Sequence, residues 1–321
     1  MNLPPPVSIC LTTYNRASVL PQTLHSLFSQ SFGDFELIIS DDCSSDNTEE
    51  ICRYYEARDP RVKYFRNPMN LKMPGNLNAA ISRAQGDYVA NVHDGDLYHP
   101  DLILKWKAAL DAVPSASFVF NDYYGFHYET GKKITWGLPF DLRVNGVEIA
   151  IYFFKTLSSC VWGTVMARRK DYEQAGPFDP RYGFISDIDM WLRLARDHDV
   201  AYVAEPLITL SPRESDHPYK FVHWHLILLM LAMYEHHLNF YGELFEDKVR
   251  PFRRAFPRRR RMLLFKQMAY CVKQQRWDRV QEGLAMWREM DDGLLRRMGN
   301  LLGNPNHLPE WYKSEFVGYF K

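Results

Sequence analysis

The sequence predicts an α/β fold, with a mixed, mainly parallel sheet flanked by helices and a helical C-terminal region. Short apolar runs alternate with segments of helical spacing through the first two-thirds of the 321 residues, which is typical of βαβ units. Clusters of acidic residues follow two of these runs, where open α/β sheets bind ligands. Beyond about residue 213 no convincing strand pattern follows, and the pattern indicates several helices.

Each predicted element rests on its own pattern. Strands are predicted for the apolar runs, which are residues 7–11, 35–40, 62–65, 88–92, 117–121, 161–167 and 200–204. Helices are predicted where apolar residues recur every three or four positions, as at Leu24, Leu27 and Phe28. These helical segments are residues 21–30, 47–57, 75–84, 101–112 and 188–196.

A change in composition predicts two domains. We expect an α/β domain over residues 1–212 that carries the chemistry, and a helical region over residues 213–321. Residues 248–276 contain eleven Lys or Arg and no Asp or Glu. Pro251 and Pro257 are expected to break helices there, because proline lacks the N–H that a helix needs.

The composition excludes several classes of protein. Lys plus Arg and Asp plus Glu number 39 each, so the net charge is zero, and 46% of residues are hydrophobic. These values exclude a disordered chain, a collagen-like fibre and a coiled-coil rod. The odd number of cysteines, without metal-ligand spacing, indicates reduced thiols in a cytoplasmic protein. We expect no secretory signal and no membrane span, because the longest apolar run, residues 226–233, is far short of ~20 residues.

The strongest chemical signal is His93-Asp94-Gly95-Asp96, directly after the predicted strand 88–92. Two carboxylates separated by one small residue at the carboxyl end of a parallel strand can hold a hard divalent cation. Such a cation can in turn bind a diphosphate. An acidic turn that caps a helix is the alternative, since Asp-x-Asp alone is a common tripeptide.

A second acidic segment, residues 40–46, closes the predicted strand 35–40. An aspartate there can accept hydrogen bonds from a ribose hydroxyl or a base N–H, and capping of the next helix is the alternative. The first loop, residues 12–16, contains no glycine and therefore does not suit the pyrophosphate turn of a dehydrogenase. The phosphates of a bound nucleotide would then be held on a metal.

In this order, the segments resemble the family 2 glycosyltransferases over about residues 7–210. The matching stretches are VSICLTTYNR, LIISDDCSSDNT, NLKMPGNLNAAISRAQGDYVANVHDGD and GPFDPRYGFISDIDMWLRLA. The resemblance implies the GT-A fold, which is Rossmann-like, and an inverting enzyme. It also implies a nucleotide-diphosphate sugar as donor, a UDP-sugar above all, with Mg²⁺ or Mn²⁺ as cofactor.

The resemblance assigns roles to positions of this sequence. The nucleotide-sugar site would contain Thr12, Tyr14, Asp41, Asp42, Asn70, Asn76, Asn78, Asp94 and Gly95. Asp96 would bind the metal with help from Asp94. His217, beyond the last strand, is a candidate third ligand, and a surface histidine without a ligand role is the alternative. Two positions depart from the family pattern, because His93 stands where many members have an acidic residue and Leu77 where many have arginine.

The segment Ser186–Arg193 resembles the family's Glu-Asp-x-Asp-x-Trp-Leu-Arg, with Ser186 in place of the glutamate. The resemblance makes Asp187 the catalytic base and Asp189 its support or second choice. Inverting transfer needs one carboxylate that takes the proton of the acceptor hydroxyl. Asp187 could instead cap the following helix, and the two roles are compatible.

Two further features concern the acceptor and the surroundings. Trp162 and Tyr182 are candidates for a platform that receives the acceptor sugar, although an aromatic residue at a strand end is more often core. The basic segment 248–276 suits either a solvated helical face or attraction to an anionic membrane surface beside a lipid-linked acceptor. No nucleic acid is expected, because the segment lacks a recognisable binding module.

The sequence therefore predicts an inverting glycosyltransferase, in the cytoplasm or on the inner face of the membrane, that builds a surface polysaccharide or lipid-linked oligosaccharide. Two other classes of protein are less well supported. A sugar-nucleotide pyrophosphorylase needs a glycine-rich phosphate loop, which residues 12–16 do not provide. A non-catalytic nucleotide-sugar-binding protein is favoured only by His93 and Ser186, the two departures at acidic positions.

Overall fold

The computed structural model describes residues 4–126, 133–135, 137–211, 224–290, 292–293 and 295–297. The chain divides into two compact units, Met1–Arg213 and Glu214–Lys321. The first unit contains the sheet, and the described residues of the second form helices.

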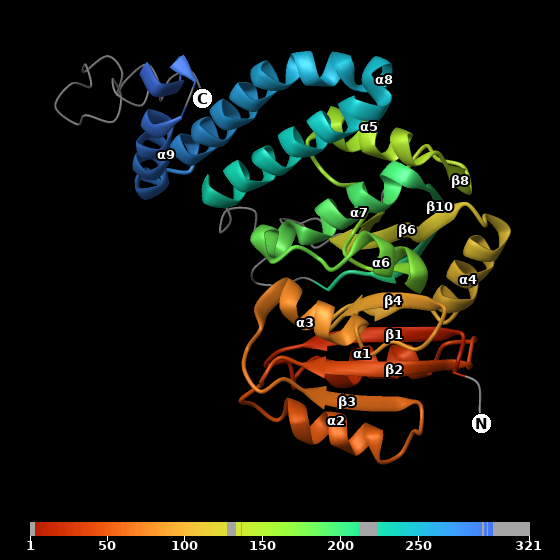
Figure 1. Ribbon diagram of the computed structural model, residues 1–321. Helices are drawn as coiled ribbons and strands as arrows, with labels where there is room; N and C mark the ends of the chain where they lie inside the picture. The colour runs from red at the N-terminus through yellow and green to blue at the C-terminus, as the bar shows by residue number, and fades with distance from the viewer. Residues whose placement is uncertain are drawn as a thin grey trace. The chain divides into compact units, whose positions relative to one another are not determined.

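The first unit is built on one sheet, whose main path follows the order β3-β2-β1-β4-β9-β6-β10-β5. The strands are β1 (Val7–Thr13), β2 (Phe35–Asp41), β3 (Val62–Arg66), β4 (Tyr88–His93), β5 (Leu97–Tyr98), β6 (Ala116–Phe126), β7 (Lys133–Thr135), β8 (Arg143–Val144), β9 (Val165–Arg168) and β10 (Asp199–Thr209). The pairs β3–β2, β2–β1, β1–β4 and β6–β10 are parallel, whereas β9 runs antiparallel between β4 and β6. The predicted mixed, mainly parallel sheet is thus confirmed (Figure 1).

Helices flank this sheet. They are α1 (Leu20–Phe28), α2 (Thr48–Glu56), α3 (Lys72–Ile81), α4 (Leu102–Ala112), α5 (Gly146–Thr156), α6 (Arg169–Ala175) and α7 (Ser186–Asp197), with a 3₁₀ helix at Pro180–Ile185. Helix α1 shows why they form: a proline lies at its start, where no N–H is needed, and Leu20, Leu24 and Leu27 form one buried stripe. Such a stripe gains stability only by packing on the sheet.

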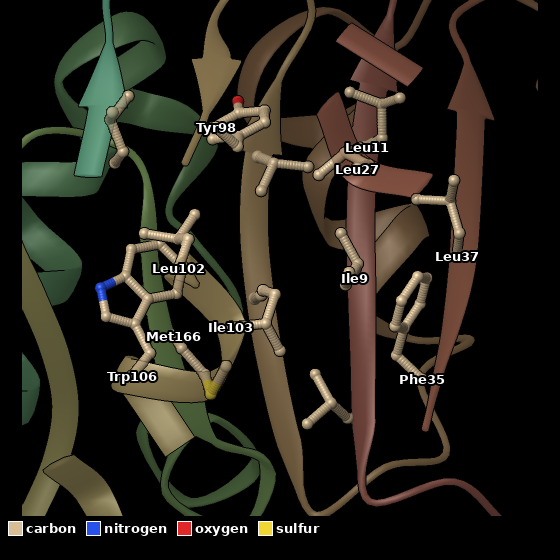
Figure 2. Packing of buried hydrophobic residues seen from close by; sticks show 14 of the residues in the cluster. Ile9, Leu11, Leu27, Phe35, Leu37, Tyr98, Leu102, Ile103, Trp106 and Met166 are labelled. Atoms are coloured by element: carbon tan, nitrogen blue, oxygen red, sulfur yellow. The ribbon is translucent and has the colours of Figure 1, made fainter. Parts of the chain in front are cut away.

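The core lies on the central strands. β1 and β2 are buried along their whole lengths, as expected where helices cover both faces of parallel strands. Figure 2 shows side chains of β1, β2, α1, α4 and β9 packed in one cluster, among them Ile9, Leu11, Leu27, Leu37, Ile103, Trp106 and Met166. This packing fixes the strands whose carboxyl ends carry the polar residues.

Some elements differ from the sequence prediction. The strand predicted from residue 161 begins only at Val165, so Trp162 and Gly163 lie in the preceding loop. No element was predicted for α5, whose β-branched and aromatic residues have low helix propensity. It packs against α7 and β10, and this tertiary burial makes it helical.

The described part of the second unit consists mainly of α8 (Trp224–Lys273) and α9 (Trp277–Glu289). Figure 1 draws α8 as two arms, and Arg260 of the second arm lies 3.6 Å from the Glu235 carboxylate of the first. A straight helix would separate these two residues by about 37 Å, so α8 folds back on itself.

The interruption in α8 falls at Phe245 (φ −133°, ψ 39°), while Pro251 and Pro257 lie inside the helix. The prediction that these prolines break helices is therefore wrong. A missing N–H can bend a helix without ending it when the neighbouring hydrogen bonds remain. Among the residues described, none of the helices combines the length and apolar composition needed to cross a bilayer.

Candidate active site

Polar residues gather where β1, β2 and β4 end. Thr12 of β1 lies beside Ser40 of β2 on one side and beside His93 of β4 on the other. Parallel strands end at the same edge of a sheet, so the loops that follow these three strands meet there. The fold thus brings Thr12 together with the two acidic segments that the sequence analysis assigns to the donor.

The loop after β1 is tied to the loop after β2. The Asn15 N–H donates to Ser44 Oγ at 2.8 Å, and the Ser45 N–H donates to Asn15 Oδ1 at 2.7 Å. Asn15 has φ 51°, a left-handed conformation that asparagine tolerates better than most residues. Tyr14, beside it, is 46% exposed, so its ring is accessible to a ligand.

Asp41 is fully buried and bonded by its own neighbours. Its Oδ1 accepts from the Ser44 N–H at 2.9 Å and from the Ser44 hydroxyl at 2.5 Å. Its Oδ2 accepts from the Tyr64 hydroxyl at 2.7 Å. These charge-assisted hydrogen bonds shape the loop after β2. A direct contact of Asp41 with a nucleotide stays a prediction.

Asp42 holds the backbone that leads into α3. Its Oδ1 accepts from the Leu71 N–H at 2.7 Å and from Asn67 Nδ2 at 3.1 Å. Its Oδ2 accepts from the Lys72 N–H at 2.8 Å, which is also 2.9 Å from Asn70 Oδ1. Asp42 and Asn70 therefore order the segment that the family resemblance places over the nucleotide.

The two asparagines of α3 bond to the protein itself. The buried Asn76 donates to the Ser40 carbonyl at 3.0 Å and accepts from the Ser40 hydroxyl at 2.7 Å. Asn78 donates to the Phe178 carbonyl at 2.8 Å and accepts from the Phe178 N–H at 2.9 Å. They tie α3 to β2 and to the chain that leads to α7. Contacts of either residue with a donor stay predictions.

A tight turn joins β4 to β5 and carries the paired carboxylates. Gly95 has φ +90°, which glycine adopts without strain, and its N–H donates to Thr23 Oγ1 at 2.9 Å. The backbone of His93 is held at both of its polar groups by Tyr98. The N–H donates to the Tyr98 hydroxyl and that hydroxyl donates to the carbonyl, each at 2.8 Å. The fold thus fixes the position of this turn.

The two carboxylates of the turn contact different elements. Asp94 Oδ1 lies 3.3 Å from Nε of Arg16, in the loop after β1. Asp96 is only 1% exposed, and its Oδ1 accepts from the Ser211 N–H at 3.2 Å, beyond the end of β10. The turn therefore lies between the first loop of the sheet and the chain that follows its last long strand.

Gly163, in the loop before β9, marks where β4 and α7 meet. A Cβ atom on Gly163 would stand 2.8 Å from Nε2 of His93 and 3.5 Å from Oδ2 of Asp187. The imidazole at the end of β4 and the carboxylate at the start of α7 therefore border the same small space. The sequence analysis places these residues in separate motifs, and the fold joins them.

Asp187 is half-buried in the first turn of α7. Burial raises the pKa of its carboxyl to about 6, and the hydrogen bond from the Ile188 N–H to Oδ1, at 2.8 Å, works against this rise. The N-cap position of α7 belongs to Ile185, so Asp187 is not the capping residue. A partly desolvated carboxylate of this kind is suited to accept a proton near neutral pH.

Asp189 has the contacts of a residue that holds α7 in place. It is buried, and its Oδ2 accepts from Arg193 Nε at 2.9 Å. Arg193 also donates to the carbonyl oxygens of Ala175 and Pro177, at 2.6 and 2.9 Å. This ion pair therefore fixes α7 against the chain that precedes it.

Accessible aromatic rings lie near this point. Trp162, directly before Gly163, is 44% exposed, and its ring centre is 5.6 Å from that of Tyr123. Tyr182 is half-buried in the 3₁₀ helix before α7, and the Arg181 guanidinium lies 5.8 Å from its ring centre. Their role toward an acceptor stays a prediction.

The turn after β4 offers donors that suit Mg²⁺ or Mn²⁺. Asp94 and Asp96 supply hard oxygen ligands, and Mg²⁺ is commonly held by one or two carboxylates plus substrate phosphates. In the described ranges, no group of three or more His, Cys, Asp or Glu could hold a metal by itself. His217 lies outside the described residues. The residues present fit a metal whose other ligands come from a diphosphate.

Three residues at this site received no role from the sequence. Arg16 pairs with Asp94, Gly163 makes room between β4 and α7, and Tyr123 packs on Trp162. An arginine at the end of a glycine-free first loop was a usable signal for Arg16. Gly163 and Tyr123 gave no local signal, because their importance depends on contacts between distant strands.

Solved structures share the fold. TarS of S. aureus in complex with UDP-GlcNAc matches with a TM-score of 0.60 at 16% identity, over 98% of this chain and 89% of that chain. The mannosyltransferase PcManGT of Pyrobaculum calidifontis, in complex with GDP-Man and Mn²⁺, matches with a TM-score of 0.55 at 13% identity, over 98% and 84%. At these identities the likeness shows the fold alone, and that fold is GT-A.

Curated relatives and a family match complete the comparison. EpsE of Bacillus subtilis, named as a glycosyltransferase, is 30% identical over 225 residues, which are 67% of this chain and 76% of EpsE. TuaG of the same organism, named for teichuronic acid biosynthesis, is 31% identical over 205 residues, 63% of this chain and 76% of TuaG. The model of the family described as Glycosyl transferase family 2 matches residues 8–176. With its GT-A fold and the acidic turn after β4, the chain belongs to glycosyl transferase family 2, the family that the sequence analysis predicts.

Proposed function

We propose that this chain transfers a sugar from a nucleotide-diphosphate donor to an acceptor hydroxyl, with inversion at the anomeric carbon. The observation that carries the proposal is the approach of the end of β4 (His93) and the start of α7 (Asp187) at Gly163. His93, which directly precedes the acidic turn, and the Asp187 carboxylate border one space. A transfer from a diphosphate to a hydroxyl requires the groups that act on the two to lie close together. A single displacement, with the leaving group on one side and the attacking hydroxyl on the other, inverts the configuration.

The nucleotide would lie over the ends of β1 and β2, near Thr12. The accessible ring of Tyr14 can pack on a base. Asp41 and Asp42 would contribute to nucleotide binding together with the loop after β2 and the segment before α3, which they order. The hydrogen bonds of Asn70, Asn76 and Asn78 would hold α3 and the segment before it in place. A UDP-sugar is the first donor to test, since TarS is solved with UDP-GlcNAc.

Asp96, with Asp94, would hold Mg²⁺ or Mn²⁺, and His217 would be a third ligand. Bound there, the metal would supply positive charge that stabilises the leaving diphosphate. The hydrogen bond from the Gly95 N–H to Thr23 holds the turn that carries the two carboxylates against α1. The Arg16 guanidinium, beside Asp94, would add positive charge near the diphosphate. This charge would replace part of the charge that is missing because Leu77 stands where many relatives have arginine.

Asp187 would remove the proton of the acceptor hydroxyl. With a pKa of about 6 it is mostly ionised at neutral pH and yet more basic than an ordinary aspartate. Asp189 would keep α7 in position through Arg193. Trp162 and Tyr182 would receive the acceptor sugar, because the C–H faces of sugars pack on aromatic rings.

The acceptor would be a growing surface polysaccharide or a lipid-linked saccharide. The name of TuaG supports the first class. The second is supported by a Campylobacter jejuni relative named GalNAc(5)-diNAcBac-PP-undecaprenol beta-1,3-glucosyltransferase, 37% identical over 93 residues, 29% of this chain and 30% of that protein. A lipid-linked acceptor would place the chain at the inner face of a membrane, where residues 248–276 would meet anionic lipid.

Calorimetric titration of the purified full chain tests the donor site. UDP, GDP, dTDP and CDP are each titrated with and without Mn²⁺, into wild-type protein and into Asp96→Ala. We expect one nucleotide to bind only with metal, and Asp96→Ala to lose that binding. Donor hydrolysis or transfer that depends on metal would then exclude a non-catalytic binding protein. Failure of every nucleotide to bind would contradict the proposal.

A further inference from the structure

His93 lies between the two halves of the proposed reaction. Its neighbours in sequence are the carboxylates of the β4 turn, where the diphosphate would be held. Its imidazole Nε2 borders the space at Gly163 that the Asp187 carboxylate borders from the other side. The anomeric carbon must be joined to the diphosphate and must also lie near the hydroxyl that Asp187 deprotonates. The transferred sugar would therefore lie within reach of this ring.

The ring of His93 stands on a fixed backbone. The Tyr98 hydroxyl bonds to both polar backbone groups of His93, and Tyr98 is itself buried. Two residues on, Gly95 forms the turn that carries the carboxylates. His93 is half-buried, so part of the residue is accessible to a ligand. A polar group positioned in this way, next to the reacting atoms, suits selective recognition.

We propose that His93 hydrogen-bonds the sugar that is transferred and so helps to select the donor, an inference that rests on the proposed function. A neutral imidazole carries one N–H donor and one acceptor nitrogen, and it can pair with a sugar hydroxyl or with an acetamido group. The acidic residue that many family members have at this position can only accept when ionised. The chain thus presents a different hydrogen-bonding group to the donor sugar.

Gly163 leaves the room that the His93 ring needs in order to reach the sugar. A methyl group there would stand 2.8 Å from His93 Nε2, closer than Cβ atoms approach other atoms, and 3.5 Å from Asp187 Oδ2, an ordinary contact. An alanine would therefore displace the imidazole first and the carboxylate much less. The absence of a side chain at Gly163 keeps the ring where the sugar would meet it.

The experiment compares a nucleotide with its sugar-bearing form. UDP and UDP-GlcNAc, and GDP and GDP-mannose, are titrated with Mn²⁺ into the full chain, and the pair that wild-type protein binds is used. In His93→Ala we expect the nucleoside diphosphate to bind within about twofold of wild type. The nucleotide sugar should bind about tenfold more weakly, as for the loss of one hydrogen bond. His93→Gln, whose amide nitrogen can take the place of Nε2, should recover most of the loss.

Gly163→Ala tests the steric half of the inference. It should weaken binding of the nucleotide sugar about as much as His93→Ala, and it should add little in a His93→Ala background, since the displaced ring is then absent. Gly33→Ala is the control, because nothing lies within 4 Å of a Cβ atom there.

Equal weakening of the nucleotide and the nucleotide sugar in His93→Ala would overturn the inference, because the ring would then only shape the turn. That result leaves the proposed function standing. If wild-type protein binds none of UDP, GDP, dTDP and CDP in the donor titration, the proposed function itself fails, and the role of His93 fails with it.

Discussion

A carboxylate that accepts a proton near neutral pH must be less solvated than an ordinary aspartate, and Asp187 meets this condition. Burial raises its pKa to about 6, so the basic form predominates only above that pH. We expect kcat/KM to rise with pH up to about 6 and then level off, because this constant reports ionisation in the free enzyme. Asp189→Asn should leave the midpoint unchanged, since Asp189 pairs with Arg193. A profile without a step near pH 6 would exclude Asp187 as the base.

The same raised pKa affects stability, with the opposite consequence. Because the folded state binds a proton more tightly than the unfolded chain, this group stabilises the fold at low pH, and that stability is lost as the pH rises through about 6. Asp187→Asn should therefore lower kcat roughly 10²–10⁴-fold, yet raise the free energy of unfolding at pH 8 by about 1–3 kcal/mol. Thermal unfolding at pH 8 and pH 4 measures this: the gain should shrink at pH 4. An equal gain at both pH values would contradict burial of the ionised carboxylate as its cause.

At the level of residues, the sequence proposes candidate side chains, but it does not show how they are arranged. The acidic pair Asp94 and Asp96 and the base candidate Asp187 stand in local motifs, so the sequence alone makes them candidates, and their roles stay predictions. The approach of His93 and Asp187 at Gly163 could not be predicted, because it depends on packing between segments far apart in the chain. The internal bonds of Asn78 were likewise invisible, since an amide that holds a backbone and one that binds a ligand look the same in sequence.

At the level of elements, Asn78 joins α3 to the chain that leads to α7. Asn78→Ala removes two hydrogen bonds to the Phe178 backbone and leaves a donor and an acceptor there to be satisfied. We expect a loss of about 1–3 kcal/mol in the free energy of unfolding and a melting temperature lower by several degrees. Asn47→Ala is the matched control, because Asn47 is exposed and its side chain makes no capping bond to α2. Equal melting of both variants would show that the link does not hold α3.

In helix α8, the structure separates the basic residues that form ion pairs from those that are exposed, which the sequence alone does not do. Several of its basic residues are paired with acidic residues, namely Arg250, Arg253, Arg260 and Arg261. Others are exposed, namely Lys248, Arg254, Arg258, Lys266 and Lys273. Arg254 and Arg258 lie one turn apart on the same face and form a short basic stripe. Exposed basic residues without an ion pair are the ones that can contact anionic lipid, so this stripe is a more specific candidate than the whole basic segment 248–276.

The stripe on α8 can be tested by charge removal. Arg254→Gln with Arg258→Gln should weaken binding to vesicles of phosphatidylserine and phosphatidylcholine by about 2 kcal/mol, roughly 30-fold, at low salt. Lys155→Gln with Lys170→Gln removes the same charge from exposed positions of the first unit and should have little effect. Co-sedimentation measures both. If the two double variants bind vesicles equally well, the stripe is only a solvated helical face.

At the scale of the whole molecule, the strongly periodic parts of the fold were predictable and the others were not. The parallel strands β1 and β2 are buried on both faces, so they appear in the sequence as short apolar runs that predict strands. The short strands β5, β7 and β8 and the helix α5 depend on partners elsewhere in the chain for their conformation. The fold of α8 back on itself, at Phe245 rather than at a proline, is another tertiary effect.

The division of the chain into two units carries the last prediction. The residues proposed for the donor, the metal and the base, from Thr12 to Asp187, lie in the first unit, and His217 follows this unit in the sequence. A chain that ends at residue 223 keeps these residues and lacks α8 and α9. We expect it to bind the preferred nucleotide with Mn²⁺ within about threefold of the full chain and to lose association with anionic vesicles. Circular dichroism and cooperative melting confirm that the shortened chain is folded. If the shortened chain folds but binds no nucleotide, the helical region is needed for the donor site. The proposal that donor binding belongs to the first unit alone would then be wrong.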